Sequence, residues 1–301
     1  MGAAPGSLLR IGELTRESVL GLLDRAEWLR ANRCGWPSLA GRVVGMFFFQ
    51  PSTRTRLGFT AAAVRFGAGT VDLLESRFAE GMSRPESAED TVRSVSTYFD
   101  ALVLRHPDAC VVQCAAASAD IPVINAGAGD DEHPTQALID LFALRRLNPE
   151  LTGLRIGVVG DLAASRSAHS LLRALDFFPP AEVRLISPPE RRLATELRSS
   201  LAYPTEELDR LALGGLDVVY IAGLPEHCGA DHMPAPARAR YRLTPERIRE
   251  LNPDAAILCP LPRIDEIDPA VDDDPRARYF AQSRDGLFVR AAVLERALID
   301  G

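Results

Sequence analysis

Residues 47–56 read FFFQPSTRTR, an apolar strand that runs directly into three hydroxyl and two guanidinium groups. Pro51 and the apolar residues that follow from position 57 favour a helix whose first turn contains Ser52 to Thr55. The first turn of a helix has backbone N–H groups without intrahelical partners, and these attract phosphate. One hydroxyl and one arginine would indicate a simple helix cap beside a solvated charge. Three hydroxyls and two arginines in five positions instead favour an anion-binding site.

Outward from this stretch, β-like runs alternate with helical segments along the chain. The expected strands are 43–49, 70–74, 101–104 and 122–125, followed by 155–160, 182–186, 216–221 and 255–259. The expected helices are 14–29, 55–66, 87–98, 108–118, 166–175, 189–199, 244–251 and 287–299, with a linking helix over 133–147. This alternation predicts an α/β fold with two doubly wound parallel-sheet domains joined by a helix. The proline-rich stretch 225–240 predicts a loop.

The length of 301 residues suits two domains with separate cores. We place them at 1–134 and 151–284, with the linking helix and a C-terminal helix over 287–301 packing back. The net charge of −7 argues against a nucleic-acid binder. Because the sequence has neither a long apolar run nor a signal-like amino terminus, we expect no membrane span and a cytoplasmic location.

Basic and sulfur-containing residues restrict the chemistry further. All 34 basic residues are arginines, so no lysine ammonium can take part in a reaction. The five scattered cysteines fit reduced thiols. Cys110 and Cys114, four residues apart in an apolar segment, are expected to be buried small residues rather than half of a zinc site. The run 227–232 contains histidine, cysteine and aspartate, but no second ligand cluster accompanies it, so no metal site is expected.

Polar clusters follow several of the expected strands. Arg105-His106-Pro107 follows the strand 101–104, residues 130–136 follow the strand near Asn125, and Pro260-Leu261-Pro262-Arg263 follows the strand ending at Cys259. Each cluster alone is compatible with an ordinary turn. Ligands of open α/β sheets bind at the carboxyl ends of the strands, so the shared position of these clusters favours a common site.

These clusters together resemble the aspartate and ornithine carbamoyltransferase family, and most closely its aspartate branch. The matching motifs, in chain order, are Ser52-Thr53-Arg54-Thr55-Arg56, Arg105-His106-Pro107, His133-Pro134-Thr135-Gln136, Gly160-Asp161-Leu162 with Arg166 and His169, and Pro260-Leu261-Pro262-Arg263-Ile264-Asp265-Glu266-Ile267. The motifs span nearly the whole chain. The resemblance implies that the first domain binds carbamoyl phosphate and the second binds an amino-acid acceptor.

The resemblance also implies roles for individual donor-site residues. The phosphate would be bound by Ser52, Thr53, Arg54, Thr55 and Arg84. The carbonyl oxygen would be surrounded by Thr55, Arg105 and His133, and the amino group held by Gln136 and the backbone carbonyls of Pro260 and Leu261. Such donors polarise a carbonyl whose oxygen becomes negative when an amine attacks. The implied catalytic residues are Arg54, Thr55, Arg105, His133 and Gln136, with no metal, cofactor or covalent intermediate.

The acceptor side matches the family less well. Arg166, followed by Ser167, corresponds to the arginine that holds the acceptor's α-carboxylate, and Leu261 would also contact the acceptor. Gly223 and Pro225 stand where the aspartate branch has an arginine and a glutamine that grip the side-chain carboxylate. Losing such a carboxylate partner would weaken binding on the order of a hundredfold.

A second departure lies in the loop that, in the family, reaches into a neighbouring subunit's site. Arg84 replaces a lysine there and can keep its positive charge, although a planar guanidinium places its donors differently. Glu80 replaces a serine and would repel a phosphate. The family forms trimers with shared active sites, so we expect a homotrimer.

These observations predict a carbamoyltransferase that uses carbamoyl phosphate and an amino-acid-like amine other than plain aspartate. One alternative is a true aspartate carbamoyltransferase of pyrimidine biosynthesis, in which residues such as Arg238 or Arg240 hold the side-chain carboxylate. Another is a catalytically silent homologue that serves as an assembly subunit. The retention of the donor-site residues argues against the silent homologue.

Overall fold

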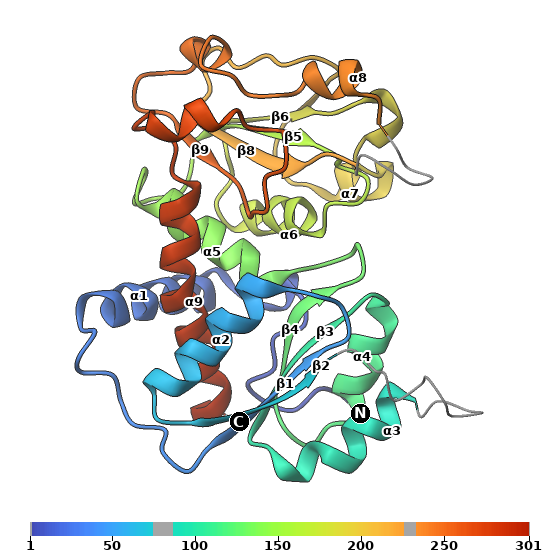
Figure 1. Cartoon of the computed structure of the whole chain (residues 1–301), viewed down its shortest axis with the longest axis vertical. Coiled ribbons are helices and arrows are strands. Elements are labelled where there is room, and N and C mark those ends of the chain that lie inside the picture. The colour runs from blue at the N-terminus through green and yellow to red at the C-terminus, as the bar shows by residue number, and fades with distance from the viewer. Residues whose placement is uncertain (1, 75–86, 226–232, 301) are drawn as a thin grey trace. The chain divides into compact units, whose positions relative to one another are not determined.

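The computed structural model describes residues 2–74, 87–225 and 233–300 (Figure 1). The chain divides into two compact units. Unit 1 comprises Met1–Leu138 and Asp285–Gly301, and unit 2 comprises Ile139–Arg284. The chain passes from one unit to the other within α5 (Pro134–Arg145) and returns within α9 (Tyr279–Asp300). Each unit is a parallel sheet with helices beside it, which confirms the predicted fold class.

The sheet of unit 1 has, within the described residues, the strand order β2-β1-β3-β4. Its strands are β1 (Val43–Phe48), β2 (Gly69–Leu74), β3 (Ala101–His106) and β4 (Val123–Ala128). Its helical segments are η1 (Ile11–Glu13), α1 (Arg16–Ala31), α2 (Thr53–Arg65), α3 (Ala88–Val95), η3 (Ser96–Tyr98) and α4 (Ala109–Ser118). The chain leaves β1 towards β2 on one side and later returns to β3 on the other. The carboxyl ends of β1 and β3 therefore form a topological switch point, where open α/β sheets bind ligands.

The part of α9 from Asp285 onward belongs to unit 1 and packs on α1 and α2. Arg25 of α1 binds the Glu295 carboxylate through two hydrogen bonds of 2.7 Å. Gly58 of α2 faces Arg290, and a Cβ at position 58 would lie 2.8 Å from that guanidinium. The glycine therefore allows α9 to approach α2 closely.

The sheet of unit 2 has, in the part of the chain that is described, the order β7-β6-β5-β8-β9. Its strands are β5 (Arg155–Gly160), β6 (Glu182–Ile186), β7 (Thr205–Leu208), β8 (Val218–Gly223) and β9 (Ala256–Leu258). The helical segments are α6 (Arg166–Ala174), η4 (Leu175–Phe177), η5 (Pro189–Arg191), α7 (Thr195–Ser200), α8 (Ala235–Ala239), η6 (Arg247–Glu250) and η7 (Pro269–Asp273). The switch point of this sheet lies between β5 and β8.

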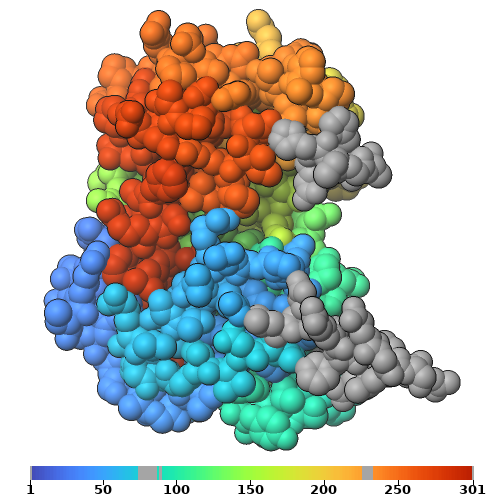
Figure 2. Space-filling model, viewed as in Figure 1, coloured from blue at the N-terminus to red at the C-terminus, as the bar shows by residue number. Residues whose placement is uncertain are grey.

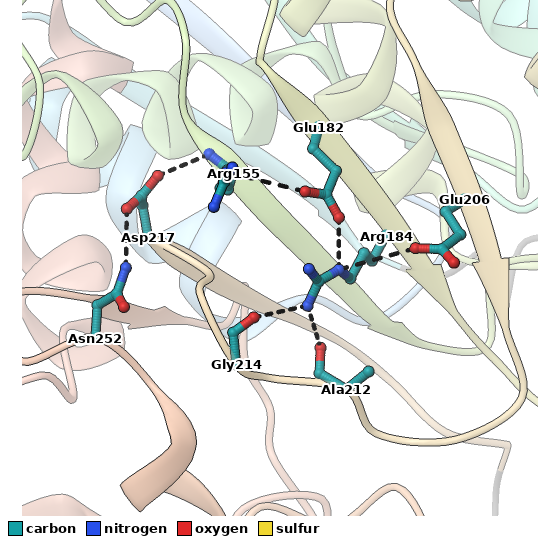
Figure 3. Close-up of polar contacts among 8 residues, drawn as sticks. All are labelled: Arg155, Glu182, Arg184, Glu206, Ala212, Gly214, Asp217 and Asn252. Carbon is teal, nitrogen blue, oxygen red and sulfur yellow. Dashed lines mark hydrogen bonds and ion pairs between the residues drawn. The ribbon is translucent and has the colours of Figure 1, made fainter.

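A polar network holds the amino ends of these strands together (Figure 3). Arg184 of β6 donates to Glu182 at 2.6 Å and to the carbonyls of Ala212 and Gly214 at 2.9 Å. The Asp217 carboxylate accepts the backbone N–H of Arg155 at 2.8 Å. These contacts lie at the end of the sheet opposite the carboxyl-end loops, so they stabilise the unit without contributing to a ligand site there.

Several predicted elements differ from the structure. The edge strand β7 was not predicted, because its sequence TEEL is polar and short. The helix expected over 189–199 is divided into η5 and α7, because the backbone is extended at Arg192 and Ala194 and the Arg191 carbonyl accepts the N–H groups of Leu162 and Ala163. A short helix, α8, lies within the stretch expected to be a loop. The segment 247–250 is a 3₁₀ turn, and the closing helix begins at Tyr279 rather than at position 287.

The prediction that Cys110 and Cys114 are buried was wrong. Both thiols are exposed on α4, whereas Val112, Ala115 and Ala116 are buried. Their spacing of four residues places both cysteines on the outer face of the helix. Among the described residues, no helix combines the length and the apolar character that crossing a membrane requires.

Candidate functional site

The start of α2 is an uncapped helix N-terminus at the carboxyl end of β1. Ser52 occupies the N-cap position with extended backbone, but its side chain makes no capping hydrogen bond. The first turn contains no acidic residue, and Thr53 and Arg54 are exposed. The hydroxyl of Ser52 is therefore not used as a cap, and the positive end of the helix dipole is not neutralised from within the helix.

Arg105 lies at the carboxyl end of the neighbouring strand β3. Its backbone is in register with Phe48 of β1, and its carbonyl accepts the N–H of Phe49 at 2.9 Å. The guanidinium donates to the Ala126 carbonyl at 3.2 Å, and only 9% of the residue is exposed. The parallel register thus places Arg105 beside the loop that leads into α2.

His133 and Gln136 lie at the start of α5, and both are buried. The His133 carbonyl accepts the N–H of Gln136 at 2.9 Å, so the backbone of His133 begins the helix. The imidazole Nε2 lies 3.5 Å from the Thr55 hydroxyl, and Nδ1 lies 3.3 Å from the Thr135 hydroxyl. The structure therefore brings His133 together with Thr55, and the imidazole acts through side-chain contacts rather than as a helix cap.

Arg166 is the first residue of α6 in unit 2, and hydrogen bonds hold the turn before it. The Asp161 carboxylate accepts the N–H groups of Ala163 and Ala164, each at 3.2 Å. Ser165 caps α6 by accepting the N–H of Ala168, and its hydroxyl donates to the Ala222 carbonyl at 3.3 Å. These bonds place Arg166 and Ser167 at the switch point between β5 and β8.

Pro260 and Leu261 form the loop after β9, and Leu261 has a φ of +57°. A branched residue in this left-handed region is strained unless its surroundings hold it. The Leu261 N–H donates to the Cys259 sulfur at 3.4 Å, and the Cys259 N–H donates to the side-chain oxygen of Gln282 at 2.9 Å. The loop backbone is therefore fixed by side chains rather than by a regular element.

Arg238, which the sequence suggested as an alternative grip for the acceptor, already binds a carboxylate of the protein. Only 2% of Arg238 is exposed. Its guanidinium binds both oxygens of Asp265, with an Nε–Oδ2 distance of 2.9 Å, and donates to the Pro225 carbonyl. Arg240 is exposed, and its guanidinium donates to the Asp209 carbonyl at 3.5 Å.

The carboxyl end of β8 has a backbone conformation that favours glycine at position 223. Gly223 has a φ of +90°. The Leu224 N–H donates to the buried carboxylate of Glu266 at 3.1 Å. A larger residue at 223 would have space for its Cβ but would be strained by this φ.

Some predicted residues lie outside the described part of the chain. These are Glu80, Arg84 and the whole run 227–232. Within the described residues, no group of three or more histidine, cysteine, aspartate or glutamate side chains could hold a metal ion.

Sequence reasoning missed a buried polar group in unit 2 that comprises Asp140, Tyr220 and Gln282. Asp140 is completely buried, and its carboxylate accepts hydrogen bonds from Tyr220 at 3.0 Å and Gln282 at 2.6 Å. A signal was present, because Asp140 is the lone charge in the otherwise apolar segment 137–142. An acidic residue within an apolar helical segment is expected to be buried, and its carboxylate then needs polar partners from other parts of the chain.

Comparison with known proteins agrees with this arrangement. Residues 7–146 match the family model described as "Aspartate/ornithine carbamoyltransferase, carbamoyl-P binding domain", and residues 152–297 match "Aspartate/ornithine carbamoyltransferase, Asp/Orn binding domain". The aspartate carbamoyltransferase catalytic subunit of Methanopyrus kandleri is 39% identical over 98% of this chain and 97% of its own length. That of Hyperthermus butylicus is 40% identical over 98% of this chain and 95% of its own length.

Solved structures give the same result. Aspartate transcarbamoylase of Trypanosoma cruzi in complex with carbamoyl phosphate is 30% identical, with a TM-score of 0.90 over 99% of this chain and 96% of that one. The catalytic subunit of M. jannaschii aspartate transcarbamoylase is 35% identical, with a TM-score of 0.87 over 97% of both chains. Both family models and these relatives together cover nearly the whole sequence, and the chain therefore belongs to the aspartate/ornithine carbamoyltransferase family of enzymes.

Proposed function

We propose that this enzyme transfers the carbamoyl group of carbamoyl phosphate to the α-amino group of aspartate and releases phosphate. The observation that supports the donor most strongly is the start of α2, where the Ser52 hydroxyl is not used as a cap. Ser52, Thr53, Arg54 and Thr55 then bind the phosphate through hydroxyls, first-turn N–H groups and a guanidinium.

In the proposed reaction the amine nitrogen attacks the carbamoyl carbon. A C–N bond forms, the carbonyl oxygen becomes negative, and the bond to the phosphate oxygen then breaks with its electron pair leaving on phosphate. The amine loses one proton overall, and the departing phosphate is a base that can take it. Thr55, Arg105 and His133 stabilise the negative oxygen, and Arg54 stabilises the leaving phosphate.

The remaining contacts follow the same assignment. Gln136 and the carbonyls of Pro260 and Leu261 accept the N–H groups of the carbamoyl amino group. Arg166 binds the α-carboxylate of the acceptor as a bidentate partner. No residue has to form a covalent bond to the substrate, since positioning and electrostatics supply the acceleration.

Aspartate is favoured as the acceptor by the relatives. Those cited above are named aspartate carbamoyltransferase catalytic subunits, and one T. cruzi structure is described as a complex with carbamoyl phosphate and aspartate. This supports the alternative given by the sequence analysis over its first expectation of another amine. Transfer to aspartate would place the enzyme in pyrimidine biosynthesis.

A second candidate is an acceptor whose side chain carries no carboxylate. It is favoured by the end of β8, where Gly223 stands with a φ of +90°, and by Arg238 of α8, whose guanidinium is bound by Asp265. Gly223 has no side chain, and the Arg238 guanidinium is already bound by Asp265, so neither residue binds a second carboxylate of the substrate.

We further propose that the enzyme works as a homotrimer assembled through unit 1. Leu57 and Val64, seven residues apart on α2, are 55% and 62% exposed, and Val71 on the edge strand β2 is 51% exposed. Figure 2 shows α2, in light blue, on the visible surface of unit 1. Exposed apolar side chains next to a sheet edge are typical of a surface that a partner covers.

A screen of acceptors tests the proposed function. The full chain is incubated with carbamoyl phosphate and either aspartate, alanine, asparagine or ornithine, and acceptor-dependent phosphate release is measured. Saturable turnover with aspartate and much weaker turnover with the others is the expected result. Preference for an amino acid without a side-chain carboxylate would establish the second candidate. Absence of carbamoyl phosphate binding in calorimetry would favour the silent homologue.

A further inference from the structure

Asp140, Tyr220 and Gln282 form a buried polar group in unit 2. This group lies between the Arg166–Ser167 turn and the Pro260–Leu261 loop, which are the two segments proposed to bind the substrates. Asp140 lies on α5, Tyr220 on β8 and Gln282 on α9, and their exposed fractions are 0%, 0% and 2%. The Tyr220 hydroxyl donates to one oxygen of the Asp140 carboxylate at 3.0 Å, and the Gln282 amide N–H donates to the other at 2.6 Å. Residues from three elements therefore meet at one carboxylate.

The amide of Gln282 extends this contact towards the loop after β9. Because its nitrogen donates to Asp140, its oxygen is turned towards the backbone N–H of Cys259, which donates to it at 2.9 Å. The Cys259 sulfur in turn accepts the N–H of Leu261 at 3.4 Å. If the amide were flipped, its N–H would face the Cys259 N–H and its oxygen would face the Asp140 carboxylate, so both hydrogen bonds would be lost. Asp140 thus fixes which way Gln282 points, and Gln282 holds the backbone of Cys259, to which the Leu261 N–H is bonded.

Tyr220 extends the contact towards the start of α6. Ser167, next to Arg166, is the hydrogen-bonding neighbour whose smaller effect lowers the pKa of Tyr220. Burial and the neighbouring Asp140 carboxylate raise the pKa of Tyr220 well above its usual value, so the phenol remains protonated and donates to Asp140. The orientation of the phenol is therefore set by Asp140.

We propose that Asp140 is a positioning residue that orders the Arg166–Ser167 turn and the Pro260–Leu261 carbonyls together. This inference rests on the proposed function, in which both loops bind the substrates. Asp140 touches neither substrate in the proposed reaction. Its carboxylate accepts at both oxygens, a property that an amide of the same shape lacks. A displacement of substrate-binding groups by about 1 Å can cost on the order of a hundredfold in rate.

Asp140→Asn in the full chain is the main test, and Asp217→Asn is its matched control. Asp217 also accepts two hydrogen bonds, from the Arg155 N–H at 2.8 Å and from Asn252 at 3.3 Å, but it lies at the amino ends of the strands (Figure 3). We expect Asp140→Asn to lower kcat/KM for aspartate about tenfold or more, and Asp217→Asn to change it less than about twofold. Thermal midpoints measured in parallel show whether the two variants lose comparable stability.

Hydrogen exchange gives a readout that does not depend on turnover. The N–H groups of Cys259 and Leu261 should exchange faster in Asp140→Asn and at the wild-type rate in Asp217→Asn. If the wild-type protein fails to carbamoylate aspartate, the proposed function is wrong, while the exchange rates still decide whether Asp140 orders the loop. Unchanged exchange and unchanged kcat/KM in Asp140→Asn would overturn the inference, as would equal losses in both variants.

Gln282→Leu and Tyr220→Phe keep the test decisive if Asp140→Asn does not fold. Gln282→Leu should accelerate exchange at Cys259 and Leu261, and Tyr220→Phe should raise KM for the acceptor while leaving that exchange slow. Where Asp140→Asn does fold, combining it with Gln282→Leu should lower kcat/KM no further than the larger single effect, since both act through one route. Fully additive effects would contradict a shared route.

Discussion

Ser52 and Thr15 occupy the same position in two helices of unit 1 but use their hydroxyls differently. Thr15 caps α1 by accepting the N–H of Ser18 at 3.2 Å. Ser52 precedes α2 in the same extended conformation and makes no such bond. Serine is a common N-cap residue, but the Ser52 hydroxyl does not cap α2 and is available to bind a phosphate at the proposed site.

Substituting each hydroxyl separates stability from binding. Ser52→Ala should change the free energy of unfolding by less than about 0.5 kcal/mol. It should weaken carbamoyl phosphate binding about tenfold, since a hydrogen bond to a charged ligand is lost. Thr15→Ala should cost about 1 kcal/mol of stability and leave binding unchanged. Urea unfolding and calorimetric titration measure both quantities, and a large stability loss in Ser52→Ala would show that its hydroxyl is a cap after all.

Two buried tyrosines of unit 2 predict how stability depends on pH. Burial, followed by a nearby carboxylate, raises the pKa of Tyr203 and Tyr220 above the usual value of 10.0. Above that pH the unfolded chain loses these protons while the folded chain keeps them. The free energy of unfolding should therefore be unaffected below about pH 10 and fall as pH rises further, by up to about 1.4 kcal/mol per pH unit for each tyrosine. Tyr203→Phe should reduce this slope, and an unchanged slope would contradict the assignment.

At the scale of elements, the carboxyl ends of β5 and β8 in unit 2 are held in close backbone contact. Gly160 ends β5 with a φ of +137°, and a Cβ there would lie 2.0 Å from the Gly223 carbonyl oxygen. The Asp161 N–H donates to that same carbonyl at 2.8 Å. The end of β5 therefore favours glycine, which allows the close approach of Gly223 at the end of β8.

Gly160→Ala should destabilise unit 2 by roughly 3 kcal/mol or more, because both the backbone and the carbonyl contact are strained. Gly214→Ala is the matched control, since a Cβ at Gly214 meets nothing within 4 Å. It should change the free energy of unfolding by less than about 0.5 kcal/mol. Chemical unfolding of both variants measures the difference, and equal stabilities would refute the close contact.

The elements that sequence predicted well are those with strong local signals. The buried strands β1 and β5 are continuous apolar runs, and α2 begins after Pro51, as its pattern indicates. The start of α9 at Tyr279 was missed because Arg284 and Asp285 interrupt its apolar pattern. Local patterns could not reveal the role proposed for Asp140, because its partner Gln282 lies 142 residues away. They could not reveal the left-handed backbone of Leu261 either, because the loop is held by side-chain contacts of Cys259 and Gln282.

For the whole molecule, the exposed apolar side chains Leu57 and Val64 of α2 lie on the surface through which we propose that the trimer assembles. Leu57→Glu combined with Val64→Glu should shift the protein from about three times the 32.7 kDa chain mass to a monomer in light-scattering chromatography. Ile299→Glu is the control, because Ile299 is also 60% exposed but lies near the end of α9. A double variant that keeps the wild-type mass would exclude this face as the interface.

The proposed reaction requires a phosphate site in unit 1 and an aspartate site in unit 2 of the same chain. Calorimetric titration with N-(phosphonacetyl)-L-aspartate, the ligand named in one T. cruzi structure, measures both sites at once. We expect binding at least about a hundredfold tighter than that of inorganic phosphate, with a loss of about tenfold or more in each of Arg54→Ala and Arg166→Ala. Binding no tighter than that of phosphate, or binding that is unaffected by Arg166→Ala, would contradict it.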